Sequence, residues 1–134
     1  MKSTQFVHKK ELFSHAASIL PVADLDTSMN FYRDKLGFEI TFTWEDPPSY
    51  AVLKRGEGVS IHLVRREDQL SPSDRHTRLY IFVYDVDALY KELRDNGLQI
   101  PDSLFDTDYG MREFEIHDPD GYRICFGMNV ERKV

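Results

Sequence analysis

The sequence predicts an α+β fold built from two repeated units, each with the order strand, helix, strand, strand, strand. Several short segments alternate apolar and polar residues with the period of two that strands have. Two longer segments carry apolar residues at helical spacing. The second half of the chain also repeats the first at an offset of about 60 residues. Together these patterns indicate one domain with an internal repeat.

The first unit begins with residues 15–22, a short apolar run that predicts a strand. Asp24 or Asp26 is expected to cap the following helix, whose apolar face continues to Leu36. Gly37 is expected to end this helix, because glycine readily adopts the left-handed conformation of a helix C-terminus. The other strands of the unit are expected at residues 38–44, 50–55 and 59–65.

The pattern restarts after a polar linker at residues 66–77. Residues 79–84 predict a strand, and it is apolar on both sides, so we expect it to be buried on both faces. Asp85 is expected to cap a helix that ends at Gly97. The remaining predictions are a short strand at 98–101, a loop at 102–109, and a final hairpin at 110–127 with a type I turn at 118–121.

Three collinear matches support the repeat. Residues 22–26, 37–40 and 59–63 match residues 83–87, 97–100 and 122–126. We therefore divide the chain into an N-terminal arm at 1–14 and a single domain at 15–134. Within that domain, the first module spans about 15–70 and the second about 77–129.

Length and charge narrow the possible functions. A chain of 134 residues fits one domain, and its net charge of −6 argues against a nucleic-acid surface, which needs a basic face. With a single cysteine, no intramolecular disulfide forms, which fits a reducing compartment. We find no signal peptide and no apolar run long enough to span a bilayer. The expected location is the cytoplasm, with no membrane partner.

With the repeat established, the chain resembles the vicinal-oxygen-chelate superfamily of glyoxalase I, extradiol dioxygenases and bleomycin-resistance proteins. The segments that carry the resemblance are VADLDTSMNFYRDKLGF, YAVLKRGEG, VYDVDALYKELRDNG and the final hairpin, within residues 17–128. The resemblance implies that the modules form a curved mixed sheet around a cleft, with the helices on the convex face. It also implies a homodimer, because family members usually cover their edge strands by pairing chains.

Enzymes of this family bind a divalent metal through the first and last strands of each module. By resemblance, the four ligand positions fall on Ala17, His62, Leu79 and Cys125. Ala17 and Leu79 have no donor atoms, and a catalytic metal site needs about three protein ligands. We therefore expect no metal and no other cofactor. The alternative metal set is His15, His62 and Cys125.

The candidate ligand-binding residues are aromatic, charged or polar side chains expected beside the cleft. They are Trp44, Tyr50, His62, Tyr109, Arg112, Glu113, Glu115 and Cys125. Glu113 and Glu115 share one face of an alternating strand. That face either looks into the cleft, where a cationic partner is needed, or lies in solvent; alternation leaves both open. Arg112 is positioned to pair with a carboxylate or with an acidic ligand.

The resemblance is closest to the bleomycin-resistance branch, which binds its ligand without a catalytic metal. We expect a small-molecule-binding protein whose guest is an organic, aromatic cation. The alternative is an enzyme, and no catalytic residue is assigned to it. It would be a lyase, isomerase or dioxygenase that uses a relocated metal, or acid/base chemistry by Glu113, Glu115 and His62. A ligand-sensing or structural module is the third possibility.

Overall fold

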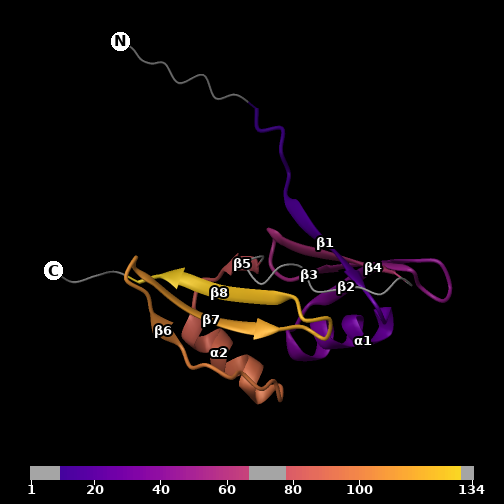
Figure 1. The fold of residues 1–134 in the computed structure, drawn as a ribbon. Coiled ribbons are helices and arrows are strands. Elements are labelled where there is room, and N and C mark those ends of the chain that lie inside the picture. Colours follow the sequence, from indigo (N-terminus) through magenta and orange to yellow (C-terminus); the bar gives the residue numbers. More distant parts are fainter. Residues whose placement is uncertain (1–9, 67–77, 131–134) are drawn as a thin grey trace, which may run out of the picture.

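The computed structural model describes residues 10–66 and 78–130, which form two four-stranded mixed sheets and their helices (Figure 1). Most of the expected linker and the first nine residues of the expected arm lie outside the described residues. The described chain confirms the α+β class and the repeated unit. Within the described ranges, no helix is both long and apolar enough to cross a membrane.

The first unit has the predicted element order. Its elements are β1 (Ala16–Val22), α1 (Leu25–Asn30), the π-helical segment η1 (Phe31–Lys35), β2 (Glu39–Trp44), β3 (Tyr50–Lys54) and β4 (Val59–Arg65). The strands are arranged β1-β4-β3-β2, and β1 pairs with β4 in parallel while the other pairs are antiparallel. The parallel pair arises because α1 and η1 carry the chain back to the start of the sheet.

The second unit repeats this arrangement. Its elements are β5 (Arg78–Phe82), α2 (Val86–Asp95), β6 (Phe105–Asp106), β7 (Met111–His117) and β8 (Arg123–Asn129). The strands are arranged β5-β8-β7-β6, again with a single parallel pair, β5 with β8. Equivalent strands therefore occupy equivalent places in the two sheets.

The helix ends follow the predicted capping residues. The Asp24 carboxylate accepts a hydrogen bond from the Thr27 amide, and the Asp85 carboxylate accepts one from the Ala88 amide. Gly37 has a φ of +74°, a conformation that glycine adopts without steric cost. These local signals place both helices because each depends on only a few neighbouring residues.

Two sequence predictions for the second unit are wrong. Residues 98–101 form no strand; the short edge strand is β6, inside the segment predicted to be a loop. The apolar side chains Leu98 and Ile100 pack against the core instead, whereas Phe105 pairs with Glu113. β5 is also not buried on both faces, because Phe82 is 74% exposed. Leu79 and Ile81 pack into the core, whereas Phe82 is on a face that the described residues leave exposed.

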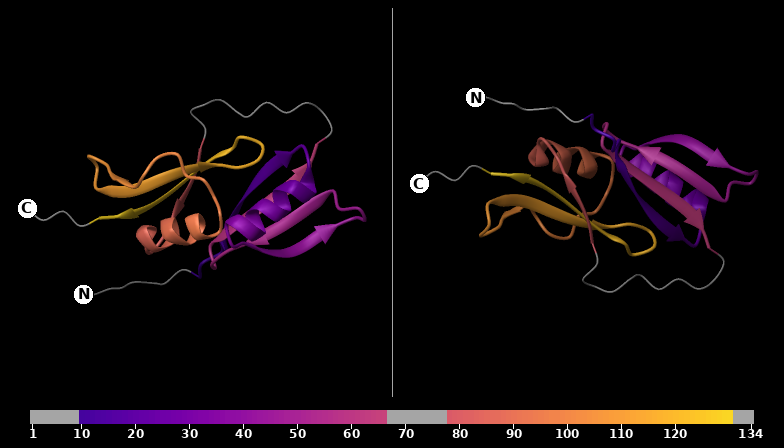
Figure 2. Two further views of the ribbon diagram at one scale, coloured as in Figure 1. Left: turned by 90° about the horizontal axis from the view of Figure 1, so that it is seen from below. Right: turned by 90° about the horizontal axis from the view of Figure 1, so that it is seen from above.

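The helices pack on one face of each sheet, with α1 against β3 and β4 and α2 against β7 and β8 (Figures 1 and 2). Between helices and strands lies one hydrophobic core that both units share. Its largest fully buried side chains are Tyr32, Leu36, Leu53, Ile61, Leu63, Leu93, Phe114, Ile116 and Ile124. The core therefore fixes which face of each sheet stays open.

The β7–β8 turn joins the second unit to the first. The Gly121 amide donates to the Asp118 carbonyl, which confirms the predicted turn at residues 118–121. The Asp118 carboxylate accepts a 2.7 Å hydrogen bond from the Tyr32 hydroxyl in η1, and burial raises the pKa of Asp118. The Asp120 carboxylate accepts hydrogen bonds from the Ala23 amide and the Ser28 hydroxyl. Buried polar groups need such partners, so this turn sets how the two units sit together.

Candidate functional site

The first sheet has an open face opposite its core face. Leu53, Ile61 and Leu63 point into the core, so their strand neighbours point the other way. Directly paired residues on this open face form two rows across the sheet, Ile19-His62-Val52-Phe42 and Pro21-Val64-Tyr50-Trp44. The aromatic side chains Phe42 and Trp44 are 51% and 60% exposed. Large apolar groups in such numbers on an open sheet face are typical of a binding surface.

Tyr50 and His62 form a pair at the centre of this face. The Tyr50 hydroxyl and His62 Nδ1 are 2.7 Å apart, and the two rings meet edge to face at 5.5 Å. Trp44 lies directly opposite Tyr50 on the neighbouring strand. The structure thus brings together three predicted site residues, and the hydrogen bond fixes the orientation of the His62 ring.

The second sheet also has an open face. Directly paired residues on this face form three rows across the sheet. They are Phe105-Glu113-Gly127-Phe82, Glu115-Cys125-Tyr80 and His117-Arg123-Arg78. Glu113 is 5% exposed, and its carboxylate accepts hydrogen bonds from the hydroxyls of Tyr80 (2.8 Å) and Tyr109 (3.2 Å). Desolvation and the bond to Glu113 both raise the pKa of Tyr80, so that phenol keeps its proton.

Glu115 has a different environment from Glu113, although both are on the same face of β7. Its carboxylate lies 3.0 Å from Arg123 Nε and 3.3 Å from Arg78 Nε. His117 Nε2 is 3.6 Å away. Glu115 is therefore neutralised by side chains of its own sheet.

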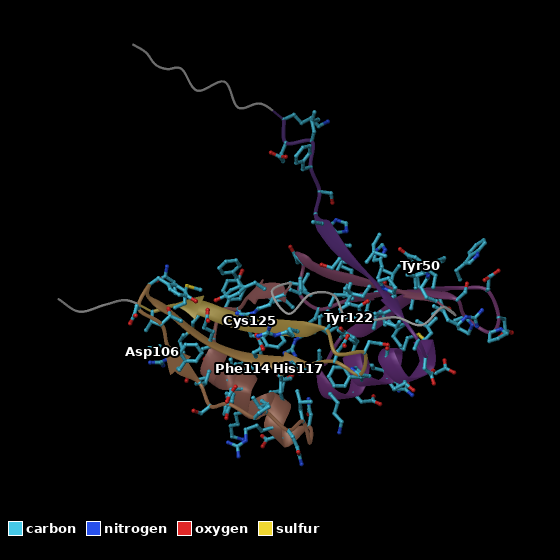
Figure 3. The ribbon with its side chains drawn as sticks, viewed as in Figure 1. Tyr50, Asp106, Phe114, His117, Tyr122 and Cys125 are labelled. Atoms are coloured by element: carbon cyan, nitrogen blue, oxygen red, sulfur yellow. The ribbon has the colours of Figure 1, made fainter. Side chains whose placement is uncertain are left out.

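Cys125 lies on β8, directly opposite Glu115. Its side chain is buried, and burial raises the pKa of the thiol to about 11, with Glu113 and Glu115 adding to the effect. At neutral pH the group is a protonated thiol, which is a poor nucleophile and a poor metal ligand. Cys125, labelled in Figure 3, belongs to the middle row of this open face, between Glu115 and Tyr80.

Arg112 is not on the open face, contrary to its predicted place beside the ligand. Its guanidinium pairs with Asp106 at 2.7 Å and with Asp87 of α2 at 3.1 Å. Arg112 is one residue from Glu113, and successive side chains of a strand point to opposite faces. It therefore joins β6 and β7 to the helix and pairs with neither Glu113 nor Glu115.

The candidate metal ligands of the alternative set lie apart from one another. Among the described residues, no three His, Cys, Asp or Glu side chains are close enough together to hold one. Leu79 pairs with Ile124 on the core side, so Tyr80, not Leu79, is opposite Cys125. Of the alternative set, His15 is exposed and hydrogen-bonds Ser14, while His62 and Cys125 are on different sheets.

The predicted residues thus fall into two groups, which the single chain does not bring together. Trp44, Tyr50 and His62 are on the first sheet, and Tyr109, Glu113, Glu115 and Cys125 belong to the second unit (Figure 3 labels Tyr50 and Cys125). A hollow of about 650 Å³ lies elsewhere, between Tyr90 and Arg94 of α2 and residues 97–101. Neither open face contributes to its lining.

Sequence reasoning missed Tyr80, Phe82 and Phe105 as members of the second open face. Tyr80 and Phe82 alternate with core residues of β5. This alternation indicates a separate open face, whereas the apolar composition of the strand predicts burial on both faces. Phe105 carries no local signal, because its place beside Glu113 depends on the pairing of β6 with β7. The alternation of β8, by contrast, places Gly127 on the same face as Cys125.

Comparisons with known proteins agree with this architecture. Residues 12–126 match the model of the Glyoxalase/Bleomycin resistance protein/Dioxygenase superfamily. Proteins named bleomycin resistance protein from Geobacillus stearothermophilus and Staphylococcus aureus are 33% identical, over 84% of this chain and 94% of theirs.

Solved structures show the same fold. A bleomycin-binding protein from Streptomyces verticillus, complexed with copper(II)-bleomycin, is 26% identical with a TM-score of 0.68, covering 92% of this chain and all of that one. TioX from Micromonospora sp. ML1 is 22% identical with a TM-score of 0.71, and the match covers 88% of this chain and 100% of the TioX chain. The family match and these relatives show that the chain belongs to the glyoxalase/bleomycin resistance protein/dioxygenase superfamily.

Proposed function

We propose that this protein binds an organic, aromatic cation in a cleft and sequesters it without a catalytic metal, as its bleomycin-resistance relatives suggest by name. The observation that carries the proposal is the pair of open faces, each with exposed aromatic side chains. The second open face also holds the buried carboxylate of Glu113. Aromatic rings and a desolvated carboxylate are complementary to a flat cation. Trp44, Tyr50 and His62 supply one wall, and Tyr109, Glu113 and Cys125 supply part of the other.

We propose further that the protein is a homodimer. The open face of each sheet is exposed in the single chain, with Phe42, Trp44, Phe82 and Tyr109 all more than half exposed. A second copy would bring the first open face of one chain opposite the second open face of the other, which makes a cleft with two walls. Such covering also removes a large exposed apolar surface from water.

A cytoplasmic location and the lack of a nucleic-acid partner are part of the same proposal. The net charge of −6 opposes binding to a polyanion, and one cysteine fits a reducing compartment. A soluble trap for a cationic molecule works best where that molecule reaches its target.

The test is a titration with metal-free bleomycin, followed by quenching of Trp44 and by calorimetry. We expect saturable binding, with Trp44 fluorescence changing at the same midpoint as the heat. Trp44→Ala is expected to weaken binding at least fivefold by calorimetry, because stacking on an aromatic face contributes about 1 kcal/mol or more. Glu57→Gln, on the exposed turn between β3 and β4, is the control and should bind as the unchanged protein does. No heat and no quenching at high bleomycin concentration would refute the proposal.

One observation favours the enzymatic alternative, namely the hydrogen-bonded Tyr50–His62 pair. Histidine is the side chain that most often moves protons near neutral pH. Mass spectrometry of bleomycin recovered after overnight incubation separates the two proposals. An unchanged mass supports sequestration alone, whereas a converted product that His62→Ala no longer forms supports catalysis.

A further inference from the structure

The two carboxylates of the second open face differ in what surrounds them. Glu115 pairs with Arg78 and Arg123. Glu113 is 5% exposed, and its two partners, Tyr80 and Tyr109, are neutral hydroxyl donors. Among the described side chains, no Lys, Arg or His forms an ion pair with Glu113. A buried carboxylate is stabilised strongly by a positively charged partner. Glu115 already has such partners, so an external cation would stabilise Glu113 more than Glu115.

Aromatic rings lie on both sides of Glu113. Phe105 is directly opposite it on β6, and Phe82 ends the same row on β5. The rings of Tyr80 and Phe82 have centroids 4.9 Å apart, and Tyr109 reaches the carboxylate from the β6–β7 loop. Phe82, Phe105 and Tyr109 are all more than half exposed, so a guest can reach their faces. Aromatic faces attract cations, which adds to the attraction of the carboxylate.

Gly127 is the residue that allows Tyr80 to reach Glu113. It lies between Glu113 and Phe82 in the same row, and a Cβ atom at this position would overlap the Tyr80 hydroxyl and lie 2.8 Å from its Cζ. The Tyr80 phenol therefore lies across the space that a side chain at position 127 would fill. Any larger residue there must push the phenol away from the carboxylate.

The geometry points to a subsite for a protonated amine at Glu113, organised by Tyr80 and Gly127. This inference rests on the proposed function, because the subsite is the cationic end of the same ligand site. Each Glu113 carboxylate oxygen accepts one hydrogen bond from a tyrosine hydroxyl and keeps further acceptor capacity. An ammonium group with N–H donors can use that capacity, whereas a neutral group of the same shape brings no charge to the buried carboxylate.

The experiment uses two small probes of nearly equal shape, benzylammonium and benzyl alcohol, in NMR titrations of the full chain at pH 7. Benzylammonium is expected to bind at least tenfold more tightly than benzyl alcohol. Glu113→Gln should remove this preference. Glu115→Gln, which makes the same change two residues away on the same face, should keep it within twofold. Equal binding of the two probes by the unchanged protein, or equal effects of the two substitutions, would overturn the inference.

The role of Gly127 is tested by a double-mutant cycle with Tyr80. Gly127→Ala should weaken benzylammonium binding at least fivefold, whereas the same change in a Tyr80→Ala background should have no effect, because the clash is gone. Circular dichroism and the thermal midpoint report whether each variant folds. If Gly127→Ala does not fold, Tyr80→Phe takes its place; it keeps the ring, removes the hydroxyl and should weaken binding at least threefold. Additive effects in the cycle, or unchanged binding by Tyr80→Phe, would contradict the assigned role.

The bleomycin and benzylammonium titrations separate the two proposals. If bleomycin does not bind but benzylammonium binds in a Glu113-dependent way, sequestration of a bleomycin-type guest is refuted and the subsite stands. If bleomycin binds but benzylammonium shows no preference over the alcohol, the proposed function stands and the subsite is wrong.

Discussion

Glu113 and Glu115 show how much a residue's chemistry depends on its neighbours. They have the same side chain, two positions apart on the same face of β7. The Glu115 carboxylate contacts two guanidinium groups, whereas the Glu113 carboxylate contacts two phenols. Of the two, Glu113 is therefore the one that we propose to bind an external cation. Cys125, on the neighbouring strand, is affected by both, since their negative charge opposes a thiolate.

At the residue scale, we predict that Cys125 is unreactive at neutral pH. Burial raises the pKa of the thiol from 9.0 to about 11, which means roughly 100-fold less thiolate at pH 7. Alkylation by iodoacetamide should be at least 100-fold slower in the folded protein than in urea, and its rate should rise with pH towards about 11. A folded rate at pH 7 that matches the rate in urea would contradict the assignment of a buried, protonated thiol.

At the scale of elements, the two units are joined by contacts between the helices and the β3–β4 and β7–β8 turns. The β7–β8 turn reaches Ala23, Ser28 and Tyr32 of the first unit. On the other side, Arg55 of the first unit pairs with Glu92 of α2 through two hydrogen bonds of 2.7 and 2.9 Å. These contacts lie on the helical side of the molecule, so they leave both open faces available.

We predict a pH-dependent contribution from the Arg55–Glu92 pair. Arg55 lowers the pKa of Glu92 in the folded state, so the pair stabilises the fold above the unfolded pKa of about 4.3. That stabilisation is lost as the pH falls through the lowered folded pKa. Both side chains are more than a third exposed, so Glu92→Gln should reduce the free energy of unfolding by at most about 1 kcal/mol at pH 7.

Urea unfolding at pH 7 and pH 3 measures this contribution, with the protein concentration held constant. The difference between Glu92→Gln and the unchanged protein should shrink at pH 3. The control is Glu57→Gln, an exposed residue on the β3–β4 turn, which should differ little at either pH. A difference that grows on acidification would show that the sign of the linkage is wrong.

At the scale of the whole molecule, the shared core decides the overall architecture. Both helices and the inner faces of both sheets meet in one hydrophobic core, and the described residues leave the two outer sheet faces exposed. Residues 10–15 leave the body of the molecule, and Leu12 and Phe13 on this segment are more than 80% exposed (Figure 1). Exposed apolar surface of this extent favours association with another copy.

We predict that the protein sediments as a dimer at concentrations on the order of tens of micromolar, where specific interfaces persist. The joint substitution of Leu12 and Phe13 by Asp should shift the equilibrium towards monomer if the segment contacts the second copy. Glu57→Gln should leave the dimer unchanged. A single monomeric species across the concentration range would rule out the dimer and, with it, a cleft with walls from two chains.

The sequence determined the repeat, both helices with their caps, the final turn and the two-sided character of the strands, because these depend on neighbouring residues. The pairing of Phe105 with Glu113, the partners of Glu115 and the place of Gly127 beneath Tyr80 were decided only by the tertiary structure. Alternation shows that a strand has two faces, but not which face is covered. The shared core determines which face is covered. The face of β7 that carries Arg112 and Phe114 packs against the core and α2, so Glu113 is on the open face.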